Sequence, residues 1–156
     1  MAKIKKIIIT DDQRKRALEL YDFSILKGSV TNGKGNTVGS LGEIIVLDYY
    51  GAEYVGSVDY DMLIKGKKVD VKTKKQKVEP NGHHTHNIFA YNTTQKCDYY
   101  CFVVISDDLS TGWIVGWKEK NSFLIESTFR RKGEVDGNSS FQFRDDCYCL
   151  NIKDLD

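Results

Sequence analysis

Apolar positions recur with a helical period over the first third of the chain. Leu18, Tyr21 and Ile25 are spaced for one helix face, and Thr10 with Gln13 forms a capping-box pattern just before them. We therefore expect a first helix over about residues 11–27. The polar, glycine-rich stretch 28–36 predicts a mobile loop, and a second helix should run from about Thr37 to Gly51.

The second predicted helix carries an acid in an apolar setting. Its apolar residues cover most of the helical wheel, so the helix should be largely buried and Glu43 should need a partner. Gly39 and Gly42 share an arc with Glu43, where the missing side chains would let a strand or a nucleic-acid backbone approach. Alternatively, Ser40 and Glu43 form a capping box if the helix begins at Ser40.

The period changes to that of strands after residue 51. The runs YDMLI and KKVDVKTK are separated by Lys65 and Gly66, which indicates a two-residue hairpin. We then expect a long connection over 79–95 with a short strand at 88–91, and connections of that length are often functional. Strands at 99–105, 112–117 and 148–152, a turn at 107–110, a short helix near 120–126 and a polar loop to about 140 complete the pattern. This order predicts an α/β fold with a mixed central β-sheet flanked by helices.

Composition limits the organisation and the setting. A chain of 156 residues with 40% apolar content can bury one core, which predicts one domain over 1–156. No run of about 18 apolar residues occurs, and the first residues lack the features of a secretory signal. We therefore expect a soluble, cytoplasmic protein without a membrane partner.

The cysteines predict neither disulfides nor zinc. Along a strand, Cys97 and Cys101 would be about 13 Å apart, and Cys147 and Cys149 about 7 Å apart. We expect reduced, partly buried thiols.

Charge gathers in one segment although the net charge is only +1. Seven lysines between residues 65 and 77 face a single acid, Asp70, which makes a local positive strip. A solvated lysine-rich hairpin is the alternative interpretation.

The hairpin register brings two acids together. If Lys65 and Gly66 form the loop, Asp61 opposes Asp70 with Cβ atoms about 5 Å apart. Their repulsion would be on the order of 3 kcal/mol at an effective dielectric near 20, so a cation should be present. Lys72, on the same face as Asp70, could supply it, as could Mg²⁺, which suits paired carboxylates. A surface ion-pair cluster remains the alternative.

These residues resemble the PD-(D/E)XK nuclease superfamily over about residues 37–127. The similar pattern is Glu43 on a helix, Asp61 on one strand and Asp70-Val71-Lys72 on the next, with Tyr60 in place of a proline that is often absent in the superfamily. The resemblance implies a restriction-endonuclease-like fold and a Mg²⁺-dependent endodeoxyribonuclease, with Mn²⁺ as a substitute. It implies that Asp61, Asp70, the Val71 carbonyl and Glu43 hold the ion, and that Lys72 orients the attacking water or neutralises the transition state.

Further contacts to DNA are expected from Lys74, Lys75, His83, His84 and His86. Lys74 is either a phosphate anchor or a solvated lysine. The three histidines could instead bind zinc or belong to an idle polar loop. A homodimer would suit cleavage of both strands of a duplex, and a catalytically silent nucleic-acid-binding protein of the same fold is the alternative function.

Overall fold

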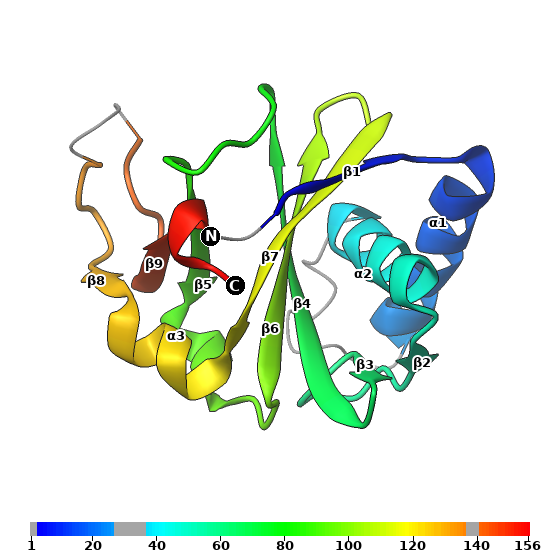
Figure 1. Cartoon of the computed structure of the whole chain (residues 1–156), viewed down its shortest axis with the longest axis horizontal. Coiled ribbons are helices and arrows are strands. Elements are labelled where there is room, and N and C mark those ends of the chain that lie inside the picture. The colour runs from blue at the N-terminus through cyan, green and yellow to red at the C-terminus, as the bar shows by residue number, and fades with distance from the viewer. Residues whose placement is uncertain (1–2, 27–36, 137–140) are drawn as a thin grey trace.

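The computed structural model describes residues 3–26, 37–136 and 141–156. A six-stranded mixed sheet forms its middle layer (Figure 1). Helix α2 (Thr37–Tyr50) lies on one face with α1 (Asp11–Leu26) packed against it, and a three-stranded sheet with α3 (Lys120–Glu126) lies on the other side. The predicted α/β class with a mixed sheet is confirmed.

Within the large sheet, the order is β1-β7-β6-β4-β3-β2. Only β4 and β6 pair in parallel; the other neighbours are antiparallel. The strands are β1 (Lys5–Ile8), β2 (Glu53–Tyr54), β3 (Met62–Ile64), β4 (Lys67–Gln76), β6 (Tyr99–Ser106) and β7 (Thr111–Glu119).

The smaller sheet has the order β5-β9-β8, and all its pairs are antiparallel. Its strands are β5 (Thr85–Phe89), β8 (Thr128–Arg130) and β9 (Cys147–Asn151), and two short 3₁₀ helices are η1 (Ala90–Thr94) and η2 (Ile152–Asp154). The predicted strand at 88–91 is thus shifted to 85–89. The polar loop predicted to follow α3 contains β8, and its residues 137–140 lie outside the described residues.

Both predicted long helices are present, and their ends follow the local chemistry. Thr10 N–H donates to Gln13 Oε1 and Gln13 N–H donates to Thr10 Oγ1, both at 3.1 Å, which confirms the capping box. Gly51 follows α2 with φ +60°, a left-handed conformation that glycine adopts readily. Since α2 begins at Thr37, Ser40 lies inside the helix, and the alternative capping-box interpretation of Glu43 is wrong. The predicted loop 28–36 lies outside the described residues.

The hairpin between β3 and β4 has the predicted register. Lys65 and Gly66 form its two-residue loop with φ values of 50° and 78°, as in a type I′ turn. Met62 pairs with Val69, and Val69 and Val71 are buried in the core. This register fixes which β4 side chains face α2 and which face the smaller sheet.

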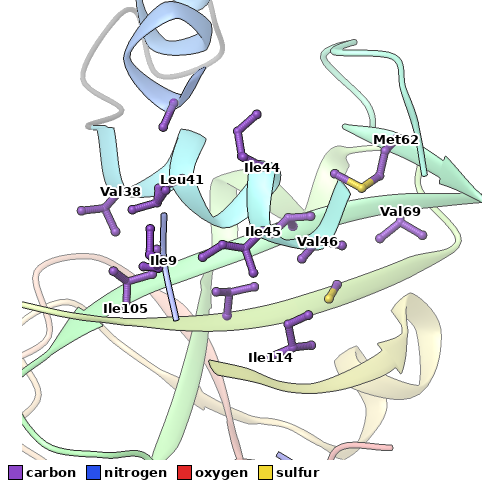
Figure 2. Packing of buried hydrophobic residues seen from close by; sticks show 14 residues of the cluster. Ile9, Val38, Leu41, Ile44, Ile45, Val46, Met62, Val69, Ile105 and Ile114 are labelled. Atoms are coloured by element: carbon purple, nitrogen blue, oxygen red, sulfur yellow. The ribbon is translucent and has the colours of Figure 1, made fainter. Parts of the chain in front are cut away.

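The core between α2 and the large sheet holds α2 in place. In Figure 2, Ile45 and Val46 project from α2 into a layer that Ile105 and Ile114 fill from the strands. Ile45 is only 1% exposed, and burying such a side chain stabilises the fold by roughly 2 kcal/mol. None of the helices in the described residues is long and apolar enough to span a membrane.

The four cysteines are free and buried, which confirms the expectation of unpaired thiols. The Sγ atoms of Cys147 and Cys149 lie 3.5 Å apart, closer than the strand spacing suggested, because both side chains are on the same face of β9.

Candidate active site

Helix α2 approaches β4 most closely at Gly42. A Cβ atom at this position would lie 1.8 Å from Thr73 Oγ1 on β4, whereas a Cβ at Gly39 would meet nothing within 4 Å among the residues that the structure describes. The absent side chain at Gly42 therefore permits the contact with a strand, one of the two approaches expected from the sequence. The next residue, Glu43, is carried to the edge of β4 as a result.

Asp61 lies just beyond the end of the β3–β4 ladder. Its N–H donates to Val69 O at 2.9 Å, and its Oδ2 accepts from the Val71 N–H at 2.7 Å. The side chain thus takes the place of a strand partner at an edge of β4 that β3 is too short to cover. The sequence suggested that Asp61 and Asp70 are directly opposed in the ladder, and the structure corrects this expectation because the ladder ends at Met62 and Val69. The two acids are nevertheless neighbours, since the charge of Asp61 helps to raise the pKa of Asp70.

The Val71 carbonyl faces the same edge. The N–H and C=O groups of one strand residue point to the same side of the strand, and the Val71 N–H points to Asp61. A backbone oxygen is therefore available beside the two aspartates.

Asp70 is held by Lys72 and by a residue from a distant segment. Asp70 is 3% exposed, and the Lys72 Nζ lies 2.6 Å from its Oδ2. Lys72 donates to Gln95 Oε1 at 2.9 Å, and Gln95 Nε2 lies 3.4 Å from Asp70 Oδ1. Although the ammonium is close, Asp70 Oδ2 accepts no hydrogen bond of good geometry from the described residues.

All three acids have raised pKa values, and burial is the largest cause for each of them. Burial and then the Asp61 charge raise the pKa of Asp70 to about 7. Burial and the neighbouring Glu43 raise the pKa of Asp61 well above its ordinary value, and burial also raises the pKa of Glu43. Lys72 opposes these shifts without cancelling them. A divalent cation that binds these carboxylates would displace the protons that the raised pKa values favour.

The three acids influence one another, with Asp61 as the common neighbour. After burial, the charge of Glu43 raises the pKa of Asp61, and the charge of Asp61 raises the pKa of Asp70. Across the described ranges, no three His, Cys, Asp or Glu side chains already surround one point in a way that could hold a metal. The donor set nevertheless fits a hard divalent cation, because it consists of oxygens and includes the buried Asp70 Oδ2, whose close neighbour is the Lys72 ammonium.

Sequence reasoning missed two side chains at this site. Tyr54, in β2, has its pKa raised by burial and then by the charges of Glu43 and Asp61. Gln95 lies at the end of the long connection 79–95. The length of that connection marked the segment as functional, but no pattern singled out Gln95 within it.

The lysines of the predicted positive strip do not form one surface. Lys74 lies on the same face as Lys72, but the smaller sheet covers it, and its ammonium donates to the backbone carbonyl of Thr85. Burial lowers the pKa of Lys74. The prediction of Lys74 as a phosphate anchor or solvated lysine is therefore corrected, whereas Lys75 is exposed.

The three histidines have different environments. His86 is 2% exposed, its Nε2–H donates to Val103 O at 3.1 Å, and burial lowers its pKa to about 3, so it cannot contact nucleic acid. The ring of His84 is held by Asn81 and Gln76. His83 is exposed and remains a candidate contact.

No known family model matches the sequence, and no curated protein matches it either. The site's chemistry is therefore inferred from this chain alone.

Proposed function

We propose that the chain is a Mg²⁺-dependent nuclease of restriction-endonuclease-like fold that hydrolyses phosphodiester bonds in DNA. The observation that carries the proposal is the gathering of Glu43, Asp61, Asp70 and Lys72 from α2 and the β3–β4 hairpin at one open strand edge. A group of neighbouring acids with raised pKa values destabilises a fold, and such groups are typical of functional sites.

The cation would be held by Asp61, Asp70 and the Val71 carbonyl, with Glu43 as a further oxygen ligand. When bound, Mg²⁺ supplies Lewis-acid polarisation of the phosphate and a more acidic water. Asp61 is already oriented for this task by the hydrogen bond from Val71. Lys72 would turn from Asp70 toward the phosphate.

Lys72 and Glu43 have separate roles in this proposal. The Lys72 ammonium donates to a phosphoryl oxygen as negative charge grows there, and its preorganisation by Asp70 and Gln95 makes that interaction effective. Burial raises the pKa of Glu43, which makes its carboxylate a stronger base toward the attacking water. Exposed lysines such as Lys65, Lys67 and Lys75 would contact the DNA backbone, and a homodimer would allow two cuts.

The experiment is cleavage of supercoiled plasmid with Mg²⁺ or Mn²⁺. The parent protein should nick or linearise the plasmid, whereas Asp70→Asn and Lys72→Met should not. Asp107→Asn and Lys132→Met are matched controls, because both residues are exposed and lie outside the site. Equal cleavage by all five proteins would indicate a contaminating nuclease and refute the proposal.

The alternative is a catalytically silent protein that grips nucleic acid. It is favoured by the finding that the acids, within the described part of the chain, do not yet converge on one point. Retardation of DNA on a gel without cleavage under any divalent cation would support this alternative.

A further inference from the structure

Gln95 connects three parts of the candidate site. Its Oε1 accepts from Lys72 at 2.9 Å, and its Nε2 donates to Val58 O at 2.8 Å and lies 3.4 Å from Asp70 Oδ1. The residue lies between η1 and β6, far in sequence from all three partners. A single side-chain amide thus joins the lysine, the buried aspartate and the loop before β3.

The orientation of this amide is fixed by its neighbours. An ammonium group can only donate, and a backbone carbonyl can only accept. The oxygen of the Gln95 amide must therefore face Lys72 and its nitrogen must face Val58. A flipped amide would lose both bonds, so the arrangement admits one orientation.

The backbone around Gln95 is also tied down. The Lys120 ammonium donates to the Gln95 carbonyl, and Lys96 N–H donates to Asp59 Oδ1 at 3.1 Å. Val58 and Asp59 belong to the same loop, so the neighbouring residues Gln95 and Lys96 both donate hydrogen bonds to that loop. These backbone contacts fix the position of Gln95, so its side chain can hold the Lys72 ammonium in one place.

The Lys72 ammonium consequently has two partners, Asp70 and Gln95. Asp70 Oδ2 at 2.6 Å attracts it by charge, and Gln95 at 2.9 Å holds it by a directed hydrogen bond. With Asp70 alone, the ammonium could settle in several positions around the carboxylate. Gln95 restricts it to one of them, and the Lys72 side chain is only 14% exposed there.

We propose that Gln95 is the positioning residue that aims Lys72 and Asp70 for phosphodiester hydrolysis. This inference rests on the proposed nuclease function. Replacing Gln95 should act on the chemical step more than on substrate binding, because Gln95 touches the reacting groups only through Lys72 and Asp70. Loss of such a supporting contact typically lowers activity about 10- to 100-fold.

The decisive variant is Gln95→Met, which keeps the length of the side chain and removes its hydrogen bonds. The control is Gln142→Met, because Gln142 is an exposed glutamine whose Nε2 also donates to a backbone carbonyl, Gly133 O at 3.1 Å. With Mg²⁺ and a short duplex, Gln95→Met should lower kcat by about 10- to 100-fold with KM nearly unchanged. A change in KM alone would overturn the proposal.

A second measurement does not depend on activity. The metal-free protein is treated with limiting acetic anhydride, and mass spectrometry compares acetylation of Lys72 with that of exposed Lys65. Losing one charged hydrogen bond should raise this ratio about tenfold in Gln95→Met. Gln95→Glu should keep it low, because its carboxylate still accepts from Lys72. This second variant also serves if Gln95→Met does not fold.

The outcomes separate the two proposals. An unchanged ratio in folded Gln95→Met, or an equally high ratio in Gln95→Glu, would overturn the role of Gln95 whatever the nuclease assay shows. A raised ratio in Gln95→Met, together with a parent protein that cleaves no nucleic acid, would instead refute the proposed function and leave Gln95 as the residue that holds Lys72.

Discussion

The carboxylate of Asp61 accepts a hydrogen bond from the backbone N–H of Val71 at 2.7 Å. This contact lies where the β3–β4 ladder has ended, so a side chain satisfies a backbone group that a longer strand would have paired. It also holds a carboxylate with a raised pKa between Glu43 and Asp70. The fold thus keeps three acids together at a cost in stability, and several measurable consequences follow.

Replacing Asp70 by asparagine should change how stability depends on pH. The folded-state pKa of Asp70 is about 7, above the ordinary value, so the folded protein binds the extra proton between about pH 4 and pH 7. This stabilisation is present below pH 4 and is lost as pH rises through 7. Urea unfolding in EDTA should therefore show the parent losing stability relative to Asp70→Asn over that interval, on the order of a few kcal/mol.

His86 titrates with the opposite sign but does so in both proteins, so it cancels in the difference between them. A difference that stays constant from pH 4 to pH 8 would contradict the raised pKa of Asp70.

Divalent cations should stabilise the parent protein most at alkaline pH. Binding must displace protons from the acids, so the apparent affinity increases as pH rises. With 10-fold excess over the dissociation constant, Mg²⁺ would add about 1.4 kcal/mol, which raises Tm by roughly 3–6 °C for a chain of this size. Thermal melts at pH 8 should show this rise, and melts at pH 5.5 should show little.

Asp61→Asn should lose the Mg²⁺ response, whereas Asp107→Asn, in the exposed turn between β6 and β7, should keep it. An equal response from both variants would place the ion elsewhere.

Gly42→Ala should destabilise the protein, because the new methyl group would overlap Thr73 Oγ1. Overpacking of this kind typically costs about 1–3 kcal/mol of unfolding free energy. Gly39→Ala is the matched control: in the described structure its Cβ would meet nothing within 4 Å, so alanine should add about 0.5–1 kcal/mol through helix propensity. Combining Gly42→Ala with Thr73→Ala should recover part of the loss. Equal stability of the two single variants would show that α2 and β4 are not in close contact.

Arg16→Lys should weaken the attachment of α1 to α2. Arg16 binds Asp48 through both its NH groups at 2.8 Å, and this pairing lowers the pKa of Asp48. A lysine cannot form both bonds, and because the pair is one-third exposed the loss should be below about 1 kcal/mol. Since the pKa of Asp48 is lowered, the difference should be present at pH 7 and fade as pH falls below about 4. The same difference at both pH values in chemical unfolding would rule out the charge pairing as its cause.

Local signals in the sequence predicted much of the fold. The capping box at Thr10 and Gln13, the glycine after α2 and the Lys65-Gly66 loop are each set by neighbouring residues, so they could be recognised without knowing the rest of the structure. Strands β1, β2 and β8 could not, because they are short and are defined by distant partners. Lys5, for example, pairs with Ile114.

The candidate site was predictable to a similar extent. Glu43, Asp61, Asp70 and Lys72 follow a recognisable order, and the structure brings them together. The alternation of β4 placed Lys74 beside Lys72, but nothing local showed that β5 covers that face. Gln95 was missed because its role depends on contacts with Val58 and Lys72 that no sequence spacing encodes.

The proposed binding of a divalent ion by these acids is tested most directly in crystals grown at pH 8 with Mn²⁺. Anomalous scattering should give a peak contacting the carboxylates of Asp61 and Asp70 and the Val71 carbonyl, with Lys72 moved away from Asp70. Crystals of Asp61→Asn should lack the peak. Full occupancy of Mn²⁺ at other residues, with Lys72 still paired to Asp70 and no peak beside Asp61, would contradict the proposed metal site.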